Sequence, residues 1–76
     1  MRILIGLFQH RQEIQQIIRS KEIDPASLTQ VGPFFSREQA VSWMRELHNR
    51  IENSEIALLP EQGSDERRWY GFTLEA

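Results

Sequence analysis

The stretch "VGPFFSREQAVSWMRELHNR", residues Val31–Arg50, carries the clearest folding signals in this chain of 76 residues. Ser36 is the predicted N-cap of a helix, because its hydroxyl can accept a hydrogen bond from the Gln39 amide while the Gln39 side chain returns to the Ser36 backbone. Phe35, directly before this cap, is predicted to pack on Ala40 as a hydrophobic staple. The buried face of the helix is predicted from three- and four-residue spacing to comprise Ala40, Trp43, Met44, Leu47 and Ile51.

The second half of this helix carries signals for its surface and its end. Glu46 and Arg50 are four residues apart, which is the spacing of an exposed ion pair on a helix. Asn53 is predicted to terminate the helix in the left-handed conformation. The pattern therefore predicts a helix with one apolar face and one charged face.

A fainter copy of this phrase, "IGLFQHRQEIQQIIRSK", lies near the start of the chain. A shift of 26 positions (Gly32 minus Gly6) aligns Gly6 with Gly32, Phe8 with Phe34, Arg11 with Arg37, Ile17 with Trp43, Ile18 with Met44 and Arg19 with Arg45. The glycine can permit a close approach or a kink at the strand end, the phenylalanine can seal the helix start, and the apolar pair can face the sheet. We therefore interpret the repeat as a folding unit used twice, not as a functional signature.

The first copy predicts a strand followed by a helix. Residues 3–8 are almost continuously apolar, which is typical of a central strand covered on both faces. Ile14, Ile17 and Ile18 then form a narrow apolar stripe on a helix. This helix should stop before Asp24, because Pro25 disfavours the helical conformation of its predecessor.

Three further segments are predicted to be strands. Residues 28–31 form a short strand that Gly32-Pro33 should stop, and residues 55–60 form another. The polar run from 61 to 67 is predicted to be a mobile hairpin loop that leads into the final strand. Tyr70, Phe72 and Leu74 share one face of that strand. Trp69, Gly71, Thr73 and Glu75 share its other face.

The predicted order is β-α-β-α-β-β, an α/β (α+β) fold. We expect a single domain over residues 1–76, a small sandwich of two helices on a mixed sheet with an antiparallel hairpin at its end. The sequence does not fix the strand order, so both a two-layer and a three-layer arrangement stay open.

Composition narrows the classes of function. The chain has no cysteine, which excludes a disulfide scaffold, a thiolate zinc site and a thiol nucleophile. Its formal charge of −2, without a block of basic residues, disfavours nucleic acid as a partner. No segment approaches the roughly 20 apolar residues of a membrane span, so we expect a cytoplasmic protein without a membrane partner.

The quoted phrase resembles the strand-to-helix segment of SPOR domains, small α/β modules of bacterial envelope proteins. The resemblance covers the first two-thirds of the chain and rests on a valine-glycine pair, an aromatic residue, a cap and an amphipathic helix. It implies binding of peptidoglycan glycan strands that lack peptide side chains. The glycan would then lie on the sheet, near Phe8, Gln30 and Phe34.

Catalytic and cofactor chemistry finds little support in the sequence. His10 and His48 are the chain's two histidines, the side chain that ordinarily titrates near neutral pH, and neither has a second ligand at metal-binding spacing. The serines lack a nucleophile elbow, and no glycine-rich loop with a lysine is present to hold phosphates. We predict no enzyme, catalytic residue, metal or cofactor. A small enzyme or ligand-binding protein with an interfacial pocket at His10 or His48 stays an alternative.

The aromatic residues favour a recognition role. Trp69 points away from Tyr70, so a core on one sheet face leaves the indole exposed beside Arg67 or Arg68, unless a helix or a second copy covers both faces. We predict Trp69, Arg67, Arg68, Phe8 and Phe34 as binding residues. The leading hypothesis is a non-catalytic module that recognises a protein or peptide by an exposed sheet face or edge and forms a homo-oligomer, with a homodimer as its simplest form.

Overall fold

Over residues 2–60 and 67–76, which the computed structural model describes, the chain folds as a four-stranded mixed sheet with two helices. The elements in chain order are β1 (Ile3–Phe8), α1 (Arg11–Lys21), a short 3-10 turn (Pro25–Ser27), β2 (Thr29–Phe34), α2 (Arg37–Arg50), β3 (Ser54–Leu58) and β4 (Trp69–Glu75). This order confirms the predicted β-α-β-α-β-β fold class, and the first helix ends before Asp24 as expected.

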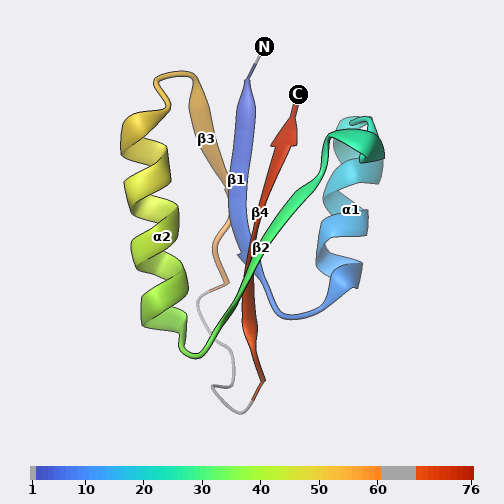
Figure 1. Cartoon of the computed structure of the whole chain (residues 1–76). Coiled ribbons are helices and arrows are strands. Elements are labelled where there is room, and N and C mark those ends of the chain that lie inside the picture. The colour runs from blue at the N-terminus through green and yellow to red at the C-terminus, as the bar shows by residue number, and fades with distance from the viewer. Residues whose placement is uncertain (1, 61–66) are drawn as a thin grey trace.

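The strands lie in the spatial order β2-β4-β1-β3 (Figure 1). β4 is antiparallel to both of its neighbours, β1 and β2, whereas β1 and β3 are parallel. The predicted terminal hairpin is therefore wrong, because β1 separates β3 from β4. The final strand instead enters the middle of the sheet, where its apolar residues are covered on both faces. The part of the predicted hairpin loop from 61 to 66 lies outside the described residues.

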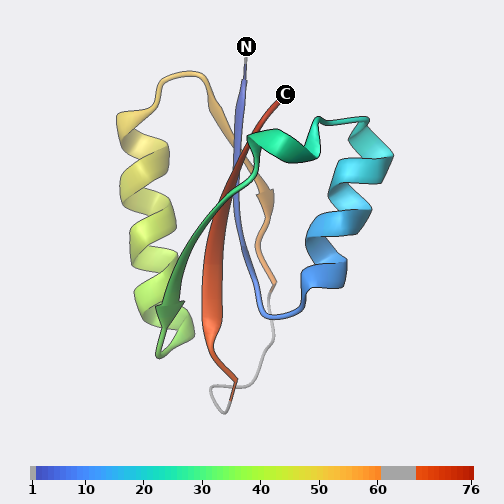
Figure 2. The same ribbon diagram turned by 45° about the vertical axis from the view of Figure 1, so that its right-hand side comes forward.

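The two helices cover opposite faces of the sheet, so the fold has three layers (Figure 2). The chain crosses from β1 to β2 by way of α1, then returns across the whole sheet to β3 by way of α2. Two crossovers that run in opposite directions with the same hand must use opposite faces. The strand order thus resolves the choice between two and three layers.

β1 contributes alternate side chains to the two halves of the core. Leu4 and Phe8 pack with Ile14 of α1 on one face. Ile5 and Leu7 pack with Ala40 and Met44 of α2 on the other. This alternation explains why residues 3–8 lack the polar positions of a strand with one wet face.

The repeated phrase proves to be a repeat of local structure. β1 and β2 begin 26 positions apart (Thr29 minus Ile3), and so do α1 and α2 (Arg37 minus Arg11). The bonds that start the two helices repeat as well. The Glu13 side chain accepts a 3.1 Å hydrogen bond from the Gln9 amide, and the Gln39 side chain accepts a 3.1 Å bond from the Phe35 amide.

The predicted cap by the Ser36 hydroxyl is confirmed, but the Gln39 side chain returns to the Phe35 amide instead of the Ser36 backbone, and the predicted staple is wrong. The Ser36 hydroxyl accepts the Gln39 amide at 3.2 Å. Phe35 is 73% exposed, and its neighbour Phe34 packs against the α2 side of the core instead. The reason is the extended backbone before the cap, which sends successive side chains in opposite directions.

The end of α2 agrees with the sequence in one respect and differs in another. Glu46 and Arg50 form the expected ion pair, with 2.6 Å between Oε1 and Nη2. The helix stops at Ile51, whose backbone is extended at φ −102°, so the predicted left-handed Asn53 terminator is wrong. Instead, the Ser54 hydroxyl donates to the Ile51 carbonyl at 2.6 Å and satisfies an acceptor at the helix end.

β2 continues through Gly32-Pro33 to Phe34, although the sequence predicted that this pair would stop it. Gly32 has φ +123°, a conformation that glycine adopts without a steric cost, and the register with β4 shifts between Val31 and Phe34. Because β2 is an edge strand, the missing amide of Pro33 can be accommodated there.

Two glycines at the centre of the sheet leave space for aromatic rings, one on each face. A Cβ on Gly6 would lie 2.6 Å from carbons of the Phe72 ring, and a Cβ on Gly71 would lie 2.6 Å from Cη2 of Trp43. The close approach predicted for Gly6 is thereby confirmed. At Gly71 the glycine allows the Trp43 indole of α2 to approach the β4 backbone closely.

We expect Gly71→Ala to lower the free energy of unfolding by roughly 1–3 kcal/mol, because the new methyl group overlaps the Trp43 indole. Urea denaturation measures this loss. In a Trp43→Leu background the obstructing ring is absent, so the same substitution should cost much less. Equal losses in the two backgrounds would show that the indole is not the cause.

Candidate functional site

The structure brings the five residues predicted for binding to one end of the sheet. Phe8 is the last residue of β1 and lies opposite Tyr70, while Phe34 ends β2 opposite Trp69. Arg67 joins this end through its carbonyl oxygen, which accepts a 3.1 Å hydrogen bond from Gln9 Nε2. Arg68 precedes β4 directly.

Two of these residues do not reach the surface. Trp69 is 0% exposed beneath α2, and Phe8 is 2% exposed, stacked on Tyr70 with 5.4 Å between ring centroids. Of the two alternatives for Trp69, the exposed indole is wrong and the covered one is confirmed, because a helix covers each face of the central strands. Phe34 is partly buried against Trp43, and only Arg67 and Arg68 are exposed.

His48 and Ser54 superficially resemble a base and a nucleophile, with 2.9 Å between Nδ1 and Oγ. The single hydroxyl proton of Ser54 is already placed by its 2.6 Å contact with the Ile51 carbonyl. His48 Nδ1 then has to donate to the serine oxygen, whereas a general base would accept from it. These hydrogen bonds of Ser54 link the end of α2 to the start of β3 and have a structural role.

His10 lies at the start of α1, where its Nδ1 is 3.5 Å from Arg67 Nη1. Both side chains are exposed. Over residues 2–60 and 67–76, no group of three or more histidine, aspartate or glutamate side chains is placed to hold a metal ion.

A small hollow of about 190 Å³ opens between α1, the 3-10 turn and the start of β2. Its lining comprises Arg11, Ile14, Gln15, Ile18, Pro25, Leu28 and Gln30. Amide and guanidinium groups thus border an apolar floor. Gln30, predicted from the SPOR resemblance to face a glycan, lines this hollow and is exposed.

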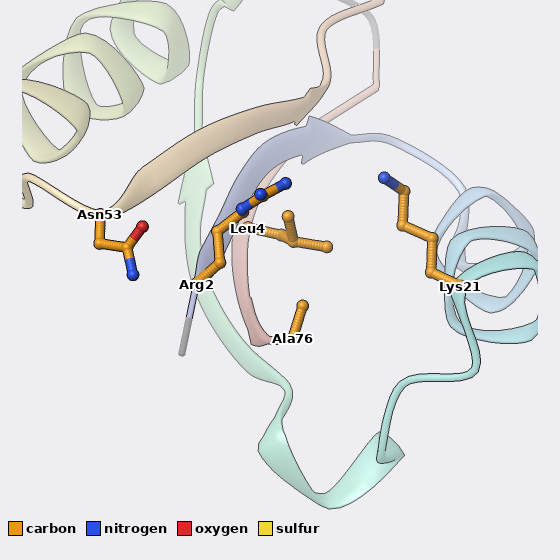
Figure 3. Close-up of a pocket in the computed structure, with 5 residues that line it drawn as sticks. All are labelled: Arg2, Leu4, Lys21, Asn53 and Ala76. Atoms are coloured by element: carbon orange, nitrogen blue, oxygen red, sulfur yellow. The ribbon is translucent and has the colours of Figure 1, made fainter.

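A second hollow, of about 390 Å³, lies where the chain ends meet (Figure 3). Arg2, directly before β1, and Lys21, at the end of α1, extend toward it with Leu4 between them. The Arg2 guanidinium also reaches β3, where it pairs with Glu55 at 2.8 Å. At the start of β3 the charge of Arg2 is therefore balanced by a carboxylate of the strand itself.

The outer edge of β3 is the feature that the sequence analysis did not single out. β3 ends the sheet and pairs only with β1 among the described strands. Ile56 and Leu59 are 37% and 39% exposed, so apolar side chains accompany the backbone groups of this edge. The apolar run "IALL" was the available signal, but it indicates an edge only once the strand order is known.

No helix in the described part of the chain is long and apolar enough to cross a membrane. Comparisons with protein-family models, curated proteins and solved structures give no match. The site therefore has to be judged on its own geometry.

Substitution of Phe34 and of Phe35 tests which of these two rings is packed against the rest of the folded protein. We expect Phe34→Ala to lower the free energy of unfolding by roughly 2 kcal/mol, because its ring packs 5.8 Å from that of Trp43. Phe35→Ala should change it by about 0.5 kcal/mol or less, since that ring is largely exposed. Thermal or urea unfolding measures both, and a larger loss for Phe35→Ala would contradict this arrangement.

Proposed function

We propose that this protein is a non-catalytic binding or assembly module that accepts an extended segment of a protein partner along the outer edge of β3. The observation that carries the proposal is the open edge of β3, bordered by the exposed side chains of Ile56 and Leu59. A partner strand would pair with the backbone groups of this edge and cover those side chains. The cytoplasmic location expected from the sequence remains a prediction.

The two edges of the sheet differ in how well they could accept a strand. β2 carries Pro33, which has no amide proton, and the bend at Gly32 disrupts its ladder. β3 contains neither proline nor lysine. Its ladder has one irregularity, because Ile5 pairs with Ile56 but Gly6 pairs with Leu58, leaving Ala57 as the extra residue. A short partner strand centred near Ile56 therefore suits this edge.

The proposal predicts that a synthetic peptide of alternating threonine and valine perturbs the backbone amide NMR signals of β3 and leaves those of β2 unchanged. Ile56→Lys should weaken the interaction about tenfold, because a charge at an edge opposes strand addition. Gln30→Lys is the matched control, since it places the same charge on the other edge strand. Signal changes confined to β2, or spread over the whole surface, would overturn the proposal.

A second candidate function is glycan binding, and the hollow beside Gln30 favours it. Sugars are recognised by polar groups that border an apolar surface, and Gln15, Gln30 and Arg11 border such a floor here. Phe8 would support the floor indirectly through its packing with Ile14, whereas Phe34 packs on the opposite, α2 face of the sheet. This candidate rests on the SPOR resemblance together with the composition of the hollow.

For glycan binding, peptidoglycan stripped of its peptides should retain the protein in a pull-down. Gln30→Ala should reduce retention about tenfold, because the side chain lines the hollow. Gln16→Ala, on an exposed part of α1 that does not line it, should have no effect. Complete flow-through of the wild-type protein would exclude this candidate.

A further inference from the structure

The edge of β3 has a basic border on the face covered by α2. The helix runs antiparallel to the strand, since His48 contacts Ser54 near one end and Arg37 Nε donates to the Pro60 carbonyl at 3.0 Å at the other. Between these two anchors, positions four and eight residues after Arg37 return to the same side of the helix. These positions are Val41 and Arg45, which line one hollow together with Arg37 and the acidic Glu38. The two arginines outnumber this one carboxylate, so the hollow carries a net positive charge.

Ile56 points toward this basic border. It lies in register with Ile5, whose side chain packs under α2, and neighbouring residues of adjacent strands share a face. In a strand added outside β3, every second side chain would therefore lie on the α2 face, next to Ile56 and near Arg45. Arg45 is exposed and available for a new ion pair.

The opposite face of the same strand has the reverse preference. Glu55 lies in register with Leu4 on the α1 face and is held by Arg2 at 2.8 Å. An acidic residue directly across from Glu55 would be repelled, because like charges on opposed positions destabilise a strand pair. The two faces of β3 thus select different side chains from one partner.

Building on the proposed strand addition, we propose that the partner is an acidic extended segment whose carboxylates alternate with uncharged residues. The carboxylates face α2, where the exposed Arg45 attracts them, and the uncharged residues face Glu55. A second copy of this chain fits less well. Two β3 strands paired about a two-fold axis normal to the sheet would bring the arginine-bearing borders of both α2 helices together.

Two matched peptides test this inference, one alternating glutamate with threonine and the other alternating lysine with threonine. In fluorescence anisotropy at low salt, we expect the glutamate peptide to bind about tenfold more tightly than the lysine peptide. Arg45→Glu should reverse this preference, and Arg45→Gln should reduce it. Arg50→Glu is the control, because Arg50 lies on the other flank of α2 beside Glu46 and should leave the preference unchanged.

The outcomes separate the charge preference from strand addition itself. If both charged peptides bind β3 equally, strand addition stands and the acidic partner is excluded. If neither these peptides nor the threonine-valine peptide changes the β3 signals, both proposals fail. Signals from β3 that change with protein concentration alone, together with a dimer in light scattering, would identify a second copy as the occupant and overturn the acidic partner. Circular dichroism of the Arg45 variants confirms that they remain folded.

Discussion

β4 forms backbone hydrogen-bond ladders on both of its edges, with β1 on one side and β2 on the other. A helix follows each of β1 and β2. The positions of both helices depend on β4, because β4 separates the two strands in the sheet. With β4 between them, the first crossover spans one strand and the second spans the whole sheet in the opposite direction. Helices on both faces follow from this order and from the common hand of such crossovers.

The same arrangement decides what the surface offers to other molecules. Covering both faces of the central strands removes Trp69 and Phe8 from the surface and leaves the sheet accessible chiefly at its borders. Of the two borders, β2 is modified by Pro33 and by the conformation of Gly32. β3 lacks proline and has one irregularity at Ala57, and the α2 helix beside it carries charged side chains.

Local features of the fold were predictable because they depend on residues close in sequence. The Ser36 cap, the Glu46–Arg50 pair and the end of the first helix before Asp24 all involve neighbours within a few positions. The alternation of faces in β4 was predictable for the same reason.

The errors have a different origin, since each depends on contacts between distant segments. The predicted hairpin assumed that consecutive strands pair, whereas β4 pairs with strands from the first half of the chain. The exposed and the covered position of Trp69 both stayed open, because the pattern of one strand cannot reveal that a helix covers its second face. The choice between Phe34 and Phe35 likewise depended on how α2 sits on the sheet, and the edge position of β3 depended on strand order.

The central position of β4 also has a consequence for the order of assembly. β4 is the last of the seven elements in the chain, yet it is the only strand that contacts both β-α units through hydrogen bonds among the residues described. During synthesis, β1 and β2 therefore emerge without a common neighbour, and each helix has an incomplete surface on which to pack. Pairings of such large sequence separation slow folding, because the ends of a long loop must meet before the contacts form. The sheet is consequently completed late, when β4 inserts between β1 and β2 and pairs with both.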